Sequence, residues 1–194
     1  MQEISEQILK DFQARKNKTQ KSKFIALILN EIQKNYPDIK AYVQEGGFPK
    51  SRNIIVGDVK TADVIFTAHY DTAPALPFPN VITPRNMLLS ILYAVIVIAL
   101  PIIFIPFIFD ILFDLPFLFS FLIRELFIVA VIILMLFGKA NKHTANDNTS
   151  GVITLFEIMS AMNEEQRSKA AFVFFDNEET GLFGSKFFSA KYAK

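Results

Sequence analysis

Three short stretches of the sequence hold the side chains that could carry out hydrolytic chemistry. The first, residues 69–72 (His-Tyr-Asp-Thr), directly follows the apolar run 64–67 (Val-Ile-Phe-Thr), which places it at the carboxyl end of a predicted strand, where open α/β sheets bind ligands. A histidine can ligate a metal through one ring nitrogen while a carboxylate orients the ring through the other. Taken alone, however, His69 and Asp71 are more typical of a surface histidine beside an aspartate.

The second and third stretches occupy similar places. Residues 145–151 (Ala-Asn-Asp-Asn-Thr-Ser-Gly) lead into a predicted helix and by themselves need be no more than its N-cap. Residues 176–185 (Asp-Asn-Glu-Glu-Thr-Gly-Leu-Phe-Gly-Ser) follow the apolar run 170–175. Their adjacent carboxylates suit either a pair that binds a cation and moves a proton, or a solvated acidic loop. One histidine and several carboxylates at strand ends together favour a metal such as zinc, bound without thiolates because the chain has no cysteine.

The soluble sequence around these stretches predicts the elements that must position them. Apolar residues at helical spacing predict amphipathic helices, at residues 4–12, 25–36 and 151–162. Short apolar runs between turn residues predict strands, at 41–43, 53–56, 64–67 and 170–175. Because the last run is apolar throughout, it suits a central strand covered on both faces. Helices that alternate with strands favour a three-layer α/β fold.

A basic run separates the first two predicted helices, formed by Arg15, Lys16, Lys18, Lys21 and Lys23. We interpret it as a solvated linker, with contact with anionic lipid head groups as the alternative. The formal net charge of the whole chain is +1, which is too low to suggest a nucleic-acid partner.

An apolar insert lies between the first and second candidate stretches. Only nine of the 51 residues at 87–137 fall outside the apolar set. The 23 uncharged residues at 87–109 are long enough to cross a hydrocarbon core of about 30 Å. The stretch 115–137 carries Arg124 and Glu125 near its middle, so it either crosses with these charges partnered or turns back within the membrane.

The charges that flank the insert predict its orientation. Arg85 precedes it, Lys139 and Lys142 follow it, and the connector between its apolar stretches holds Asp110 and Asp114 but no base. The positive-inside rule then places both soluble parts in the cytoplasm, which requires an even number of crossings. We therefore expect a multi-pass protein of the cell (inner or plasma) membrane, held in the lipid bilayer by a transmembrane helical hairpin. The expected division is into a first soluble part, the hairpin and a second soluble part, at 1–86, 87–137 and 138–194.

Together, the three stretches resemble the ordered motifs of the co-catalytic zinc aminopeptidases of metallopeptidase family 28 (clan MH), in a membrane-inserted bacterial branch. The residues that carry the resemblance are 66–72, 145–151 and 174–179 through Gly184 and Ser185. It covers roughly residues 54–192 apart from the insert. The resemblance implies a three-layer α/β/α zinc-exopeptidase fold with a mixed sheet, which is incomplete in this chain and interrupted by the hairpin.

The resemblance also implies a role for each site residue. His69 would ligate the first of two zinc ions, and Asp71 would orient its ring as part of the catalytic machinery. Asp147 would bridge both ions. Glu178 would act as the general base for the attacking water, and Glu179 would ligate the second zinc.

Two further features follow from the resemblance. The bond between Asp147 and Asn148 would be a cis peptide. The family completes its site with an Asp and a second His, whereas this chain stops 15 residues past Glu179 and its only other histidine is His143. We therefore expect a C-terminally truncated or split reading frame, with a C-terminal fragment as the partner that supplies the missing ligands.

By this resemblance, we expect the N-terminal part of a membrane-anchored zinc aminopeptidase that hydrolyses the N-terminal peptide bonds of short peptide substrates. The alternative is a non-catalytic membrane protein whose hydrolase-like domain has a binding or assembly role. A third hypothesis keeps the fold and changes the reaction, since related zinc folds also cyclise N-terminal glutamine or deacylate amino acids.

Overall fold

The structure, a computed structural model, describes residues 2–75, 86–113 and 116–192. It consists of two compact units. Unit 1 is formed by Met1–Ala73 and Ala140–Lys194, and unit 2 by Pro74–Lys139.

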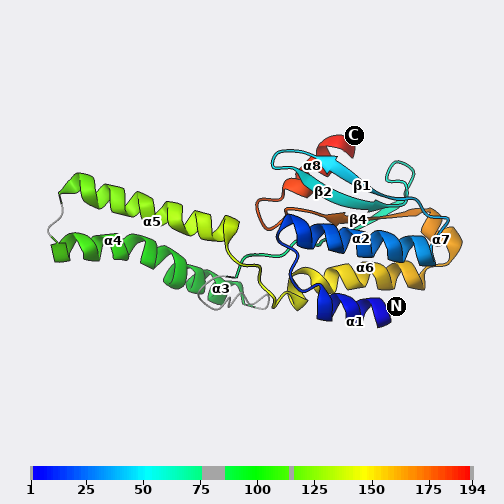
Figure 1. Cartoon of the computed structure of the whole chain (residues 1–194), viewed down its shortest axis with the longest axis horizontal. Helices are drawn as coiled ribbons and strands as arrows, with labels where there is room; N and C mark the ends of the chain where they lie inside the picture. The colour runs from blue at the N-terminus through cyan, green and yellow to red at the C-terminus, as the bar shows by residue number, and fades with distance from the viewer. Residues whose placement is uncertain (1, 76–85, 114–115, 193–194) are drawn as a thin grey trace. The chain divides into compact units, whose positions relative to one another are not determined.

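A four-stranded mixed sheet forms the centre of unit 1 (Figure 1). Its strands are β1 (Ala41–Gly46), β2 (Ser51–Val56), β3 (Val64–His69) and β4 (Ala170–Phe175), arranged in the order β1-β2-β4-β3. The pairs β1–β2 and β2–β4 are antiparallel, whereas β3 and β4 are parallel. All four predicted strands are confirmed. β4 is a central strand, because it pairs with β2 and β3, and its apolar side chains are covered on both faces of the sheet.

Helices pack against both faces of this sheet. They are α1 (Gln2–Asp11), α2 (Lys18–Asn35), α6 (Ser150–Ala161), α7 (Glu164–Ser168) and α8 (Phe183–Tyr192). Helices α1, α2 and α6 lie together on one side (Figure 1), where Ile28 and Phe156 join Phe172 of β4 in the main core. On the opposite face, Phe188 of α8 packs with Val173. The mixed α/β architecture is therefore confirmed, and the complete three-layer arrangement stays a prediction.

The basic run differs from its prediction as a solvated linker in two ways. Because α2 begins at Lys18, only Arg15 and Lys16 lie between α1 and α2, and two members of the run are buried. Arg15 is fully buried, and Lys21 has only 8% of its surface exposed. The Lys21 Nζ atom lies 2.5 Å from Oδ1 of Asp176, and Arg15 donates hydrogen bonds inside the unit. These partners offset the cost of removing the two cations from water.

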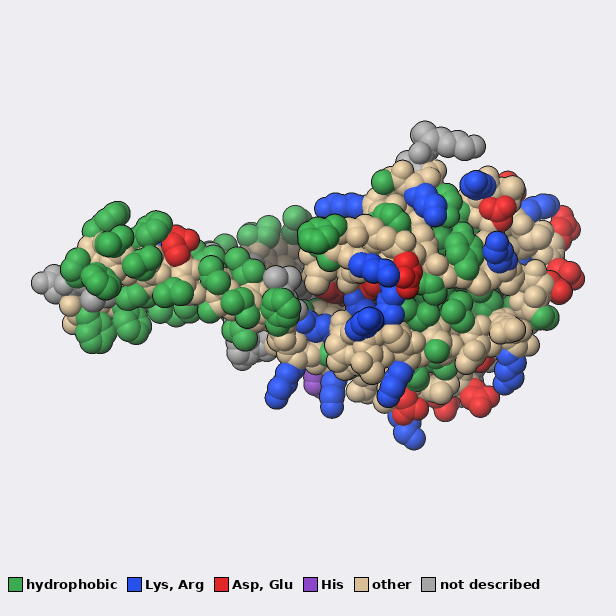
Figure 2. Space-filling model, turned by 45° about the horizontal axis from the view of Figure 1, so that its top comes forward, with side chains coloured by type: hydrophobic (Ala, Val, Ile, Leu, Met, Phe, Trp, Pro, Cys, Tyr) green, Lys and Arg blue, Asp and Glu red, His purple; other side chains and the backbone are tan. Residues whose placement is uncertain are grey.

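Unit 2 is a helical hairpin. Its elements are α3 (Met87–Ala94), the π-helical turn η1 (Val95–Ala99), α4 (Leu100–Phe113) and α5 (Phe117–Phe137). Helices α4 and α5 lie side by side (Figure 1), and most of their large apolar side chains are exposed. Figure 2 shows their surface as almost entirely hydrophobic. Two stretches, Met87–Phe113 and Phe117–Leu134, are long and apolar enough to cross a membrane.

The hairpin geometry is consistent with its proline content. The π-helical turn ends two residues before Pro101, whose ring lacks an N–H donor and crowds the preceding turn of helix. Arg85, Asp114 and Leu115, on which the predicted orientation and second crossing partly depend, lie outside the described residues. The cytoplasmic orientation and the multi-pass topology therefore stay predictions.

Candidate metal site

The candidate site lies at the carboxyl-terminal edge of the parallel pair β3 and β4. Because the two strands run in the same direction, with His69 opposite Phe175, the segments that follow them leave the sheet side by side. The π-helical turn η2 (Ala145–Thr149), which precedes α6, reaches the same place. The topology thus brings together the three stretches that the sequence analysis singled out.

One residue from each stretch contributes to a compact group. His69, Asp147 and Glu179 each offer one ligand atom, and these atoms all lie within 4.8 Å of one another. The His69 Nε2 atom lies 3.2 Å from Asp147 Oδ1. Asp147 is the exposed member, with 69% of its side chain accessible, so the group faces outward and a ligand can reach it.

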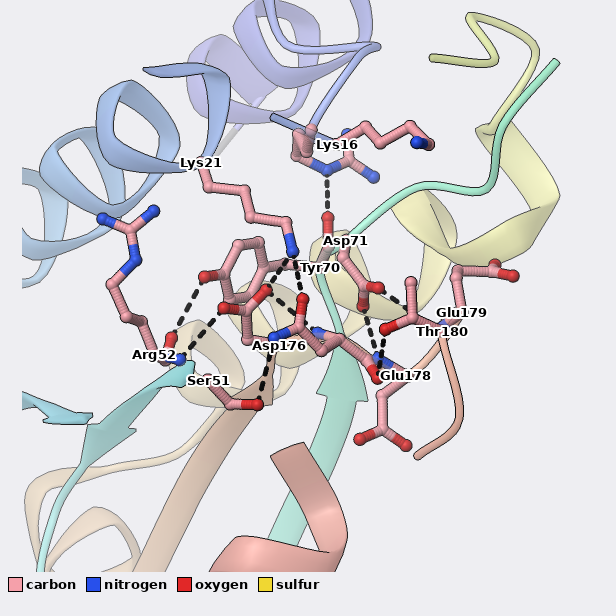
Figure 3. Close-up of polar contacts among 12 residues, drawn as sticks. Lys16, Lys21, Ser51, Arg52, Tyr70, Asp71, Asp176, Glu178, Glu179 and Thr180 are labelled. Atoms are coloured by element: carbon pink, nitrogen blue, oxygen red, sulfur yellow. Dashed lines mark hydrogen bonds and ion pairs between the residues drawn. The ribbon is translucent and has the colours of Figure 1, made fainter. Parts of the chain in front are cut away.

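Asp71 lies beneath this group and connects its parts. Its carboxylate is almost completely buried, with Oδ1 3.5 Å from His69 Nδ1. The same carboxylate accepts hydrogen bonds from the backbone N–H groups of Glu178 and Glu179, both at 3.1 Å (Figure 3). A single buried side chain therefore fixes the loop after β4 relative to the histidine that ends β3.

The acidic residues after β4 have three separate environments. Asp176 is buried, forms an ion pair with Lys21 and accepts a hydrogen bond from the backbone N–H of Arg52 (Figure 3). Glu178 accepts hydrogen bonds from the backbone N–H and the hydroxyl of Ser185, at 2.7 and 3.0 Å. Only Glu179 belongs to the group with His69, and Figure 3 shows its carboxylate directed away from that of Glu178.

The electrostatics of the group reflect its crowding. Burial lowers the pKa of His69, but the hydrogen bond and charge of Asp71 and the charges of Asp147 and Glu179 outweigh this effect and raise the pKa to about 9. Burial, followed by repulsion from Asp147, raises the pKa of Glu179 to about 7. A cation at this place would relieve the repulsion between the carboxylates of Glu179 and Asp147.

The backbone around Asp147 has the form that the resemblance implies. The bond between Asp147 and Asn148 is a cis peptide, so that prediction is confirmed. A side chain at Gly151 would overlap the amide of Asn148. Glycine at the start of α6 therefore leaves the room that this backbone conformation needs.

Comparison with known families agrees with the motif order. Residues 131–194 match the family model described as Peptidase family M28. This part of the chain belongs to peptidase family M28. The match includes Asp147, Glu178 and Glu179, whereas His69 and Asp71 precede it. Searches of curated proteins and of solved structures found no match. Membership of M28 indicates a peptide hydrolase at the general level.

The donor set fits the metal that such a peptidase would use. Zinc binds histidine nitrogen and carboxylate oxygen at about 2.0–2.2 Å, so two donors on one ion lie roughly 3–4 Å apart. The 3.2 Å between His69 Nε2 and Asp147 Oδ1 meets this condition. The described residues of this chain thus contain a His/Asp/Glu group that could hold a metal ion.

Sequence reasoning missed the residues that support the site from the N-terminal part of the chain. Arg15 and Lys21 contact segments that carry the motifs, and Ser185 holds Glu178. A run of bases between two helices contains no signal that distinguishes a buried cation from a solvated one. For Ser185, the motif itself includes the residue but does not show which carboxylate it binds.

Proposed function

We propose that this chain is a zinc-dependent aminopeptidase, anchored in the membrane, that hydrolyses the N-terminal peptide bonds of short peptides. The observation that carries the proposal is the meeting of His69, Asp147 and Glu179 at one edge of the sheet. They come from three stretches spread over about 110 residues of sequence, and part of this sequence matches the model of a peptidase family.

Two zinc ions would share this group of residues. His69 and Asp147 would hold the first ion, and Asp147 and Glu179 the second. When bound, zinc lowers the pKa of a coordinated water and polarises the scissile carbonyl. Asp71 would keep the His69 ring in the orientation needed for ligation, since its carboxylate faces Nδ1 and leaves Nε2 free to bind the metal.

Glu178 would act as the general base and accept a proton from the attacking water. Its carboxylate accepts hydrogen bonds from Ser185, so this role requires Glu178 to exchange at least one of these bonds for the water. The cluster of carboxylates at the open edge would attract the α-ammonium group of a peptide, which favours cleavage at the N-terminus of the substrate.

The proposal includes further ligands from outside these residues. Each ion would have two protein donors among the residues described, whereas catalytic zinc usually has three. We propose that a C-terminal fragment supplies an additional aspartate and histidine. The same shortage of donors, with Glu178 bonded to Ser185, favours the alternative of a non-catalytic hydrolase-like protein with a binding or assembly role.

Zinc content and hydrolysis of a peptide panel separate these functions. We expect a longer chain that carries the further Asp and His to bind about two zinc ions. Glu178→Gln should lower its turnover roughly 10²–10⁴-fold, because the general base is lost, while its zinc content stays unchanged. Glu165→Gln, which alters an exposed ion pair with Lys169, is the matched control.

The outcomes of this experiment are distinct. Full turnover in Glu178→Gln would refute the aminopeptidase mechanism, and absence of zinc binding in the longer chain would favour the non-catalytic role. Release of a cyclised N-terminal glutamine or of a deacylated amino acid, in place of a free N-terminal residue, would identify the third reaction class.

The membrane part of the proposal has its own test. We propose that the hairpin crosses the cell membrane twice and leaves both soluble parts in the cytoplasm. Protease added outside intact cells should then leave the segment after Lys142 uncut. Cleavage there would contradict the cytoplasmic orientation.

A further inference from the structure

Arg15 is the largest fully buried side chain in the described structure, and its guanidinium has no carboxylate within ion-pair distance among the described residues. Burial lowers the pKa of Arg15 to about 10, with the charge of Asp71 acting in the opposite direction. The side chain therefore stays protonated at neutral pH, and all of its N–H donors persist. An arginine buried in this way must find neutral acceptors.

The guanidinium joins three segments of chain that are far apart in sequence. Its Nη1 donates to the carbonyl of Phe12 at the end of α1. Its Nε donates to the carbonyl of Tyr70 at 2.5 Å, and its Nη2 to the hydroxyl of Thr149 at 2.8 Å. Tyr70 follows the metal-ligand candidate His69 directly, and Thr149 lies two residues after Asp147.

The rest of Arg15 is fixed as firmly as its tip. Its backbone N–H donates to the hydroxyl of Thr72 at 2.9 Å, and its carbonyl accepts from the Thr72 N–H at 3.3 Å. The guanidinium lies over the ring of Phe24, 5.1 Å from its centroid, and Phe24 stacks on Tyr70. Arg15 is therefore held firmly enough to keep the segments of Tyr70 and Thr149 at a fixed distance from each other.

We propose that Arg15 is a positioning residue of the candidate metal site. By bonding Tyr70 and Thr149 with two arms of one planar group, it holds the segment of His69 and the segment of Asp147 in register, so that Nε2 and Oδ1 stay within 3.2 Å. The inference rests on the proposed function for the identity of the ligand, which is a zinc-like cation.

Lysine is the discriminating substitution at this position. It keeps the charge and much of the apolar stem, but its ammonium cannot reproduce the planar fork that reaches two acceptors in different segments. Arg15→Lys should therefore let the distance between the two segments vary, while it keeps the positive charge of the side chain at this position.

The chain contains a matched control in Arg167. This arginine also donates to two backbone carbonyls, those of Met159 and Met162, and also lies 5.1 Å from an aromatic centroid, that of Tyr36. None of these partners belongs to the segments that carry the candidate ligands. Arg167→Lys thus removes contacts of the same kind at a place that does not position the site.

The experiment measures Zn²⁺ and Co²⁺ affinity of the detergent-solubilised full chain by competition with a chromophoric chelator. We expect Arg15→Lys to bind these ions about 10–100-fold more weakly, as for other residues that orient metal ligands. Arg167→Lys should bind them like the unsubstituted chain, even if it lowers the thermal midpoint as much as Arg15→Lys does. Equal affinity in Arg15→Lys, or an equal loss in both variants, would overturn the proposal.

A metal-free readout keeps the inference separate from the proposed function. Hydrogen exchange of the metal-free chain should accelerate at residues 69–73 and 144–150 in Arg15→Lys but not in Arg167→Lys. If the unsubstituted chain binds neither ion, the proposed function fails, while exchange still decides the role of Arg15. Unchanged exchange at both segments would refute that role.

A milder variant covers the case in which Arg15→Lys does not fold. Thr149→Val removes the hydroxyl that accepts from Nη2 and that also lies 3.2 Å from the hydroxyl of Thr144, and it keeps the volume of the side chain. We expect faster exchange at residues 144–150 and weaker ion binding in this variant. Exchange and affinity like those of the unsubstituted chain would contradict the proposal.

Discussion

Units 1 and 2 place the same apolar residue types in opposite surroundings. In unit 1, Phe156 and Phe172 are about 1% exposed, whereas Phe104 and Phe117 in unit 2 are 49% and 87% exposed. The apolar residues of unit 1 alternate with polar ones at helical spacing or form short strands, and a shared core covers them. Those of unit 2 form continuous stretches that two helices cannot cover for each other. Two stretches of unit 2 are accordingly long and apolar enough to cross a membrane, where lipid would cover these side chains.

The charged side chains of the two units also lie in different environments. Unit 1 buries Arg15, Lys21 and Asp71, each with hydrogen-bond or ion-pair partners inside the unit. In unit 2, Arg124 and Glu125 pair with each other at 3.3 Å and both side chains are about half exposed, while Arg124 also lies 5.1 Å from the centroid of the Phe121 ring. Buried charge in unit 1 is thus part of its packed structure, whereas the pair in unit 2 is not needed for packing.

The largest expected effect comes from removing unit 2. The backbone N–H of Asn141 donates to the carbonyl of Ala73 at 2.9 Å, so the two chain ends of unit 1 are neighbours. Replacing residues 75–139 by a short Gly-Ser linker should convert a membrane-bound chain into one that is soluble without detergent. Ultracentrifugation of lysates, with the full chain as control, measures this. A shortened chain that still sediments with membranes would show that unit 1 itself binds them.

The next largest difference between the units should come from replacing one phenylalanine in each and comparing the loss of stability. Phe172→Ala removes a ring from the main core, at a cost of about 3–5 kcal/mol of unfolding free energy. Phe104→Ala removes an exposed ring and should leave the stability of unit 1 unchanged. Calorimetry of the detergent-solubilised chain compares the two midpoints. Equal losses would mean that Phe104 belongs to a packed protein core.

Removing charged side chains should give a somewhat smaller difference in unfolding free energy between the units than the phenylalanine substitutions. Lys21→Met leaves Asp176 buried without its cation, and breaking such pairs costs about 3–5 kcal/mol. We expect a value at the lower end, because Asp176 still accepts from the backbone N–H of Arg52. The double substitution Arg124→Leu with Glu125→Leu should not destabilise unit 1. Urea unfolding of both variants measures the contrast, and a loss of stability in the double variant would contradict it.

The sequence predicted the four strands well, because their apolar runs end at glycine and proline turns that fix their limits. It also placed His69 and Glu179 after strands that meet at one edge because β3 and β4 are parallel, and Asp147 at the start of a helix, which reaches the same edge. It could not predict which bases of the run at Arg15–Lys23 are buried. Burial there depends on carbonyl and hydroxyl acceptors from segments more than fifty residues away, and composition contains no trace of them.

The orientation of adjacent carboxylates was equally beyond the sequence. Glu178 and Glu179 are neighbours in the chain, yet one bonds Ser185 and the other faces His69. Their directions depend on the turn that follows β4, where Asn177 adopts a positive φ of 57°. Leu182, in the same loop, also has a positive φ, of 60°, and residue type alone does not reveal such a turn.

The smallest expected effect is a pH dependence confined to unit 1. The pKa of His69 is raised from 6.5 to about 9 and that of Glu179 from 4.5 to about 7. Both groups bind protons more tightly in the folded chain than in the unfolded chain. Their contribution to stability is therefore complete at acidic pH and is lost as pH rises through about 7 and then about 9.

The thermal midpoint of the metal-free chain should thus fall between pH 5.5 and pH 9. Zinc should reverse the trend, because ligation needs His69 and Glu179 without their protons, so the stabilisation by added zinc grows with pH. His69→Asn should weaken the pH dependence, whereas His143→Asn should preserve it. Calorimetry with a chelator and with zinc measures both trends. A thermal midpoint of the metal-free chain that rises over this range would contradict the raised pKa values of His69 and Glu179.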